Sequence, residues 1–152
     1  MDNNVNTSFT PPTSDERLLA LLAHLSIMFG GIILPIILWA TQKDRSRFVT
    51  YNSLLALFFH ISYAALIIIF VIIMFVAMII SGAAGAGGFN NSSPEMPMAM
   101  LIIIIVFYAG IIAVIFAGIG YGVYLAIKAY QGKLVSIPVL GNIVYKKVYG
   151  EN

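Results

Sequence analysis

WATQKDRSRFVTYN (residues 39–52) is the one stretch in the middle of this chain where charged residues crowd together. Long apolar runs without formal charge flank it on both sides. A catalytic loop, a nucleic-acid-binding patch and a polar turn between two membrane segments would each concentrate charge in this way. The sequence around the stretch decides between these three readings.

The composition of the whole chain indicates an integral membrane protein. Of its 152 residues, 61% are hydrophobic and 9% are charged, whereas soluble domains carry about 25% charged residues. A soluble chain of this length has too small an interior to bury so many aliphatic side chains. The absence of cysteine excludes disulfides, thiolate nucleophiles and thiolate metal sites. A net charge of +2 is too small to indicate nucleic-acid binding.

Three apolar runs reach the roughly 20 residues that a helix needs to cross a bilayer. They cover residues 18–39, 54–80 and 98–127, and none contains Asp, Glu, Lys or Arg. Lipid offers no partner for free backbone amides, so the spanning segments must be helices. Thr13 and Glu16 fit a capping box at the start of the first helix. The sequence therefore predicts an all-α fold with a three-helix transmembrane domain over residues 13–130.

The distribution of basic residues predicts an orientation. Seven of the eight lie in the two segments that three crossings would place on the same side, and only Arg17 lies elsewhere. The positive-inside rule then places the N-terminus outside and the C-terminus in the cytoplasm of a bacterial cell, with the cytoplasmic membrane as the location. The same seven residues are candidate contacts for lipid headgroups: Lys43, Arg45, Arg47, Lys128, Lys133, Lys146 and Lys147.

Three polar segments flank the predicted spans. Residues 1–12 have a composition typical of disorder, and they lack the basic leader of a cleaved signal peptide. Residues 81–97 resemble a flexible outer linker and not a phosphate-binding loop, because no strand precedes their glycines and no Lys-Ser/Thr follows. In the tail, residues 131–152, apolar side chains recur at helical spacing from Leu140 to Val148. That spacing predicts a short amphipathic segment on the cytoplasmic interface.

Small residues form two stripes along the third predicted span. Helices in lipid associate where small side chains let their backbones approach closely, and Gly118 with Gly122 forms a GxxxG motif. We expect these stripes to serve packing within the chain, with contact to another membrane protein or to a second copy as the alternative. The stripes consist of Ala109, Gly110, Ala113, Ala117, Gly118, Gly122 and Ala126.

Two histidines fall within the predicted spans. An ionisable side chain in the membrane is a functional candidate by default. A tight antiparallel hairpin of the first two spans would place His60 level with Gly30 and Gly31, and His24 near Ala64, so the histidines would not share a metal ion. We expect neutral histidines that hydrogen-bond across helices. The candidate intramembrane polar site consists of His24, Ser26, His60, Ser62 and Tyr63, with Thr50 as a further partner.

Catalysis and coupled transport both lack their usual residues here. No nucleophile motif surrounds Ser26 or Ser62, and no acid is available to orient a histidine base. A coupled transporter normally has a buried carboxylate and repeated halves with broken helices. The sequence therefore predicts a protein without enzymatic activity, cofactor or metal.

Four segments of the chain resemble those of a known family: DERLLALLAHLS (15–26), LPIILWATQKDRSRFV (34–49), YNSLLALFFHISYA (51–64) and KAYQGKLVSIPVLGNI (128–143). They are similar to the Tic-twenty-like family, small bacterial membrane proteins related to a chloroplast inner-envelope import component. The similarity covers roughly residues 15–145. It implies a link to protein translocation, although relatives often carry histidine near Tyr51–Asn52, and the plastid protein has four spans where three are predicted here.

These observations lead to one main hypothesis and two alternatives. The main hypothesis is a non-enzymatic subunit or scaffold of a membrane complex, which docks onto other membrane proteins through the small-residue stripes. The first alternative is an oligomeric channel or carrier for a peptide or small solute, lined in part by His24 and His60. The second is a membrane protein of immunity or stress response. In each case the partners are the lipid bilayer and other membrane proteins or further copies, and not nucleic acid.

Overall fold

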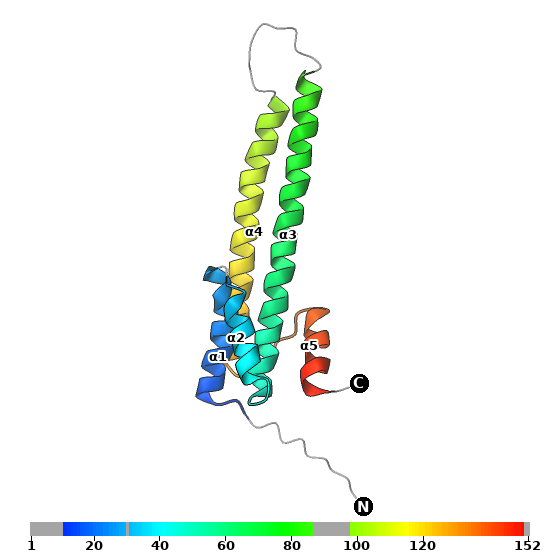
Figure 1. The fold of residues 1–152 in the computed structure, drawn as a ribbon. Helices are drawn as coiled ribbons and strands as arrows, with labels where there is room; N and C mark the ends of the chain where they lie inside the picture. Colours follow the sequence, from blue (N-terminus) through cyan, green and yellow to red (C-terminus); the bar gives the residue numbers. More distant parts are fainter. Residues whose placement is uncertain (1–10, 30, 87–97, 151–152) are drawn as a thin grey trace, which may run out of the picture. The chain divides into compact units, whose positions relative to one another are not determined.

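The computed structural model describes residues 11–29, 31–86 and 98–150, and all regular structure within them is helical (Figure 1). The predicted all-helical fold is thus confirmed. Most of the predicted N-terminal tail and most of the linker over residues 81–97 lie outside the described residues. The helices are α1 (Ser14–Leu25), η1 (Ser26–Phe29), α2 (Ile33–Gln42), α3 (Arg47–Ala86), α4 (Met98–Tyr130) and α5 (Leu140–Tyr149).

The chain divides into two compact units. The first unit comprises residues 1–58 and 122–152, and the second comprises residues 59–121. Helices α3 and α4 each contribute residues to both. This division differs from the predicted one into a tail, a transmembrane domain and an interfacial tail, whose boundaries stay a prediction.

Helices α3 and α4 have the length and composition of membrane spans. Their apolar portions run over Arg47–Ser81, 35 residues, and Met100–Tyr130, 31 residues. No proline interrupts either portion, and α3 contains no glycine before Gly82, so the backbone hydrogen bonds of both helices can continue without a break. These two helices are consistent with a membrane protein, and they contain the second and third predicted spans.

The first predicted span is not confirmed, because residues 18–39 do not form one helix. Helix α1 has 12 residues and α2 has 10, which correspond to roughly 18 and 15 Å of helix, against about 30 Å of hydrocarbon core. Between them the chain reverses through η1, and α2 returns alongside α1. The amide of Gly31 donates to the Ser26 carbonyl at 3.0 Å, and Ser26 Oγ donates to the Ala23 carbonyl at 2.8 Å. These bonds satisfy backbone groups where α1 ends.

Three small apolar clusters hold the first unit together. Ala23 of α1, Leu38 of α2 and Ala56 of α3 form one of them. Ala20 of α1 forms another with Phe48 and Ala129. Since alanine lets helix backbones approach closely, α1 is held against both α3 and α4.

Helix α5 packs against the beginning of α3. Tyr51, Leu54, Leu55 and Val144 form a buried cluster, which Leu140, Val148 and other apolar side chains cover. Ile143 is exposed. Gly150, with a φ of 76°, ends the helix in a left-handed conformation that glycine adopts without strain. The predicted short helix is therefore present, and its position on a membrane interface stays a prediction.

The first turn of α1 lies beside the C-terminal end of α4. A Cβ built on Gly132, just after α4, would lie 3.2 Å from Arg17 Nε and 3.2 Å from Pro12 Cγ. The side chain of Glu16 hydrogen-bonds that of Ser46, which lies between α2 and α3. The orientation predicted above placed Arg17 and Lys133 on opposite faces of a membrane. It is not confirmed, because segments in direct contact cannot lie on opposite faces.

The second unit is an antiparallel pair formed by the described parts of α3 and α4 within it. Phe70 stacks on Phe107 with ring centroids 6.1 Å apart, and Gly110 also faces Phe70. Tyr63 Oη donates to the Val114 carbonyl at 2.7 Å. Because Tyr63 pairs with a later part of α4 than Phe70 does, the two helices run in opposite directions.

Candidate functional site

The polar residues buried in the first unit form what we call the polar core. Its members are His24, Ser26, Ser46, Thr50, Asn52 and Ser53, each at most 6% exposed. A buried polar group costs free energy unless it is hydrogen-bonded. The hydrogen bonds of the polar core therefore indicate which helices it fastens together.

The contact between His24 and Asn52 joins α1 to α3. His24 Nε2 lies 3.2 Å from Asn52 Oδ1, and Asn52 Nδ2 donates to the Phe48 carbonyl at 2.9 Å. Since the amide nitrogen of Asn52 is used within α3, its oxygen faces the histidine and accepts a hydrogen bond from Nε2. The arrangement suits an imidazole that carries its proton on Nε2.

Hydroxyl groups fasten the charged turn between α2 and α3. Ser46 Oγ accepts from the Val49 amide at 3.2 Å, as an N-cap side chain does. Thr50 Oγ1 lies 2.7 Å from the Ser46 carbonyl and 3.0 Å from the Gln42 carbonyl. The turn that carries Lys43 and Arg45 is thereby held against the first turn of α3.

The predicted capping box at the start of α1 is confirmed, and Ser46 extends it. The Thr13 amide donates to Glu16 Oε2 at 2.7 Å, and the Glu16 amide donates to Thr13 Oγ1 at 3.3 Å. Hydrogen bonds from the Ser46 side chain and the Thr13 backbone hold the pKa of Glu16 below its usual value. The carboxylate therefore links the start of α1 to the start of α3.

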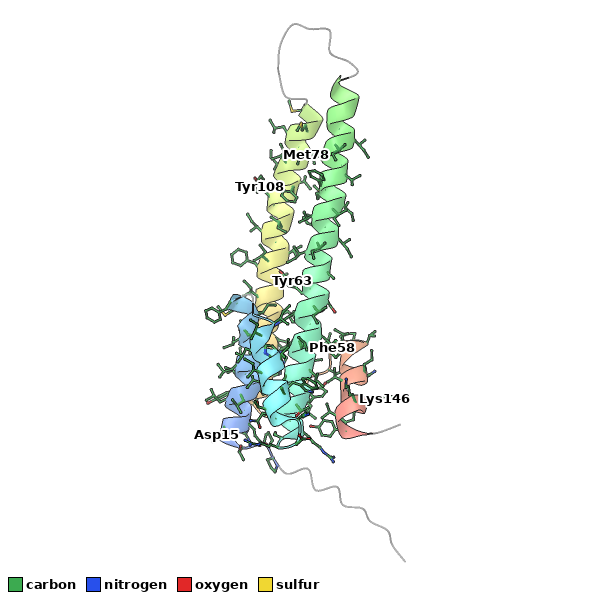
Figure 2. The ribbon with its side chains drawn as sticks, viewed as in Figure 1. Asp15, Phe58, Tyr63, Met78, Tyr108 and Lys146 are labelled. Carbon is green, nitrogen blue, oxygen red and sulfur yellow. The ribbon has the colours of Figure 1, made fainter. Side chains whose placement is uncertain are left out.

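All eight basic residues belong to the first unit, at helix ends or just beyond them, and we call them the cationic rim. Asp15, Glu16 and Asp44 are the acidic residues that the structure describes among them. Figure 2 shows two of these charged groups, Asp15 at the start of α1 and Lys146 on α5. The rim consists of Arg17, Lys43, Arg45, Arg47, Lys128, Lys133, Lys146 and Lys147.

An aromatic cluster lies next to the rim. Tyr51 of α3 contacts Tyr145 edge-on and also approaches Tyr149, each with ring centroids 6.2 Å apart. Tyr51 Oη donates to the Val135 carbonyl at 2.9 Å, which holds the segment before α5. Burial, together with Tyr145 and Tyr51, raises the pKa of Tyr149 to about 12, although Arg47 opposes the shift. Tyr149 is therefore neutral in its packed position.

The residues of the predicted intramembrane polar site divide between the two units, and the site as a whole stays a prediction. His24 and Ser26 belong to the first unit, whereas His60, Ser62 and Tyr63 belong to the second. His60 is buried beside Phe59, Ser62 is exposed, and Tyr63 bonds the backbone of α4. The expected partners of the two histidines were Ser26, Ser62, Tyr63 and Thr50, whereas Asn52 lies within hydrogen-bond distance of His24. The prediction assumed two long antiparallel spans, but the reversal at η1 makes α1 run parallel to the beginning of α3.

Asn52 is the residue that the sequence reasoning missed as a site. A signal was present, because Thr50, Asn52 and Ser53 lie in the first two turns of a largely apolar helix, and Ser46 directly precedes it. Polar residues concentrated at one end of a membrane helix need partners from neighbouring helices. The signal indicates that partners exist, but it does not identify them.

The structure separates the two predicted stripes of small residues. Two glycines of one stripe pack against other residues of the same chain. A Cβ on Gly118 would overlap the ring of Tyr63, and one on Gly122 would lie 2.7 Å from Ile27 Cγ2. Ala126, on the same stripe, is buried. The alanines of the other stripe are exposed, and their role as a surface for a partner stays a prediction: Ala109, Ala113 and Ala117.

Among the residues that the structure describes, no three His, Asp or Glu side chains lie close enough together to hold one metal ion. Hydrogen bonds in the first unit join α1 to the beginning of α3 and to the turn before it, and one from Tyr51 joins α3 to the segment that follows α4. The basic residues of the cationic rim lie at the ends of the same helices.

Comparison with known proteins gives one family. Residues 15–144 match the model of the MamF/MmsF family, described as the magnetosome magnetite crystal formation protein family. The match begins in the first turn of α1 and ends within α5, so it covers nearly the whole chain. The resemblance to the Tic-twenty-like family was wrong, and the link to protein translocation that it implied loses its support. Short apolar strings around a charged turn are too unspecific to separate two families of small membrane proteins. No curated protein and no solved structure matches the chain.

Proposed function

We propose a structural role in magnetosome formation, because this chain belongs to the magnetosome magnetite crystal formation protein family. In this role the chain is a small, non-enzymatic membrane protein that influences crystal formation as a component of the membrane around the mineral. The observation that carries the proposal is the family match over residues 15–144.

The polar core supports a structural role over a catalytic one. His24, Ser46 and Thr50 are used to fasten helices, through Asn52, the Val49 amide and backbone carbonyls. A catalytic base must instead reach a proton on a substrate, and His24 is only 1% exposed. The side chains of the polar core therefore support a role in holding the helices of the first unit together.

The exposed alanine stripe supports the scaffold part of the proposal. Ala109, Ala113 and Ala117 lie on one face of α4, where a helix from another membrane protein or from a second copy can approach closely. Near them along α4, Tyr108, which Figure 2 labels, is 61% exposed. Phe116 of the same helix is 72% exposed. Large side chains next to small ones provide the ridges and hollows that helix packing uses.

The test is complementation in a magnetite-forming bacterium that lacks its own member of this family. The chain is expressed there, and crystal sizes are measured by electron microscopy. We expect sizes to move from those of the deletion strain towards those of the parent. The Asn52→Leu variant, which loses the bond to His24, should complement less well than the matched exposed variant Asn142→Leu. Crystals unchanged from the deletion strain, with the protein present in the magnetosome membrane, would contradict the proposal.

A further inference from the structure

We propose that α1, η1 and α2 form a re-entrant hairpin, which enters one leaflet of the membrane from the side of the cationic rim. In this arrangement the tip of the hairpin contacts lipid acyl chains and does not reach the opposite surface. Only α3 and α4 cross the membrane. The start of α1 and helix α5 then lie on the same, cytoplasmic face.

The depth of the hairpin follows from its contacts with α3 and α4. Its tip meets α4 at Gly122, where the added Cβ would lie 2.7 Å from Ile27 Cγ2. Gly122 precedes the end of α4 at Tyr130 by about eight residues, which is roughly 12 Å of helix. Half of a hydrocarbon core is about 15 Å. The tip therefore reaches close to the middle of a bilayer that α4 crosses, and it stops there.

The tip is apolar, and its side chains are exposed among the residues that the structure describes. Phe29 is 86% exposed, Ile33 is 71% exposed and Met28 is 52% exposed. Three such neighbours would form an unfavourable patch in water, whereas acyl chains solvate them well. These residues favour lipid tails as the occupant of this surface.

Where α1 ends, the backbone at the reversal has the hydrogen-bond partners that lipid requires. Irregular backbone is tolerated at membrane depth where protein surrounds it and its polar groups find partners. Ser26 is 4% exposed, and its carbonyl accepts from the Gly31 amide while its hydroxyl donates to the Ala23 carbonyl. The turn can therefore sit below the headgroups.

The base of the hairpin, where α1 begins and α2 ends, carries basic residues. Arg17 lies beside Gly132 at the end of α4, and Lys43 and Arg45 lie between α2 and α3. With two crossings, all eight basic residues of the rim face one side of the membrane, whereas three crossings would separate Arg17 from the other seven. The positive-inside rule identifies that side as cytoplasmic, and anionic headgroups there attract the rim.

The absence of cysteine from the chain allows a direct test by single-cysteine labelling. The variants are Ser14→Cys at the start of α1, Lys133→Cys after α4, and Ser92→Cys in the segment that joins α3 and α4. A membrane-impermeant maleimide is applied to intact spheroplasts and to opened membranes. We expect Ser92→Cys to be labelled in both preparations. Ser14→Cys and Lys133→Cys should be labelled only in opened membranes. Labelling of Ser14→Cys from outside would overturn the proposal, because α1 and α2 would then complete a crossing.

A second measurement tests insertion separately from sidedness. An environment-sensitive fluorophore is attached to Phe29→Cys, and the full chain is reconstituted in vesicles that contain anionic phospholipid. Lipids with a spin label in the middle of the acyl chain should quench it more than lipids with a labelled headgroup, while a fluorophore at Ser14→Cys should show the reverse order. A fluorophore at position 29 that neither lipid quenches would place the hairpin in water and overturn the proposal.

Discussion

His24 Nε2 lies 3.2 Å from Asn52 Oδ1, and the two side chains are 1% and 2% exposed. This contact joins two helices that hydropathy alone would place in separate antiparallel spans. With the capping interactions of Glu16 and Ser46, it sets the beginning of α1 beside the beginning of α3.

Removal of the Asn52 amide should destabilise the first unit. In Asn52→Leu the Nε2 group of His24 loses its acceptor in a buried position, a change that typically costs about 1–3 kcal/mol. Thermal unfolding of the purified protein in detergent, followed by circular dichroism, should therefore shift to lower temperature. Asn142→Leu alters an exposed asparagine of α5 and should leave the transition in place. The double variant His24→Leu/Asn52→Leu should be more stable than the sum of the single changes implies. Strict additivity would contradict a direct contact.

The glycines of α4 should differ sharply in their tolerance of a methyl group. In Gly118→Ala the new Cβ overlaps the ring of Tyr63, and overpacking of this kind costs about 1–3 kcal/mol. A Cβ on Gly120 would meet no described atom within 4 Å outside its own stretch of the helix. The matched variant Gly120→Ala should therefore be neutral, or stabilising by up to about 1 kcal/mol through helix propensity. Equal unfolding temperatures for the two variants would show that Tyr63 does not pack on Gly118.

The attachment of α5 should fail at alkaline pH. Folding raises the pKa of Tyr149 from about 10 to about 12, first because of burial. A tyrosine is neutral when protonated, so its contribution to stability is complete below the unfolded pKa and is lost as pH rises through the folded one. We expect α5 to detach between about pH 10 and pH 12. The ultraviolet absorbance of phenolate and the accessibility of a cysteine on α5 should change together over this range.

The control for that titration is a tyrosine outside the aromatic cluster. Tyr149→Phe should move the detachment of α5 to higher pH, because it removes the group that ionises. Tyr130→Phe, at a position that is 56% exposed, should leave the detachment unchanged. If the pH of detachment is unchanged in Tyr149→Phe but shifts in Tyr130→Phe, ionisation of Tyr149 is not the cause.

The contact between α1 and the charged turn should weaken in acid. Hydrogen bonds from Ser46 and Thr13 lower the pKa of Glu16 in the folded protein. The stability that they contribute is present above the unfolded pKa of about 4.5 and is lost as pH falls through the lower folded value. Stability measured from pH 6 down to about pH 3 should therefore decline less in Glu16→Gln than in the unaltered chain. Asp15→Asn, at a neighbouring exposed carboxylate, should retain the full decline.

Hydropathy and local patterns were sufficient for several parts of the fold. The membrane class and helices α3 and α4 follow from long uncharged runs, because lipid requires a helix wherever such a run crosses it. The capping box of Thr13 and Glu16 and the helical spacing of Leu140, Val144 and Val148 are local signals, and the structure contains both features. These predictions succeeded because each depends on residues close together in the chain.

The path of residues 18–39 could be decided only by tertiary structure. Twenty-two apolar residues are long enough for one full crossing, and they are equally long enough for two half-length helices that reverse. The distribution of basic residues separates these possibilities by Arg17 alone, because the other seven are placed alike in both.

Packing between distant parts of the chain decides the path of residues 18–39. Ala20 and Ala23 seat α1 against α3 and α4, Gly122 makes room for Ile27, and Asn52 meets His24. The sequence by itself therefore determined which segments are helical and apolar. Only the tertiary structure decided where the chain turns back, because the free energy of a reversal depends on the surfaces that receive it as well as on the residues that turn.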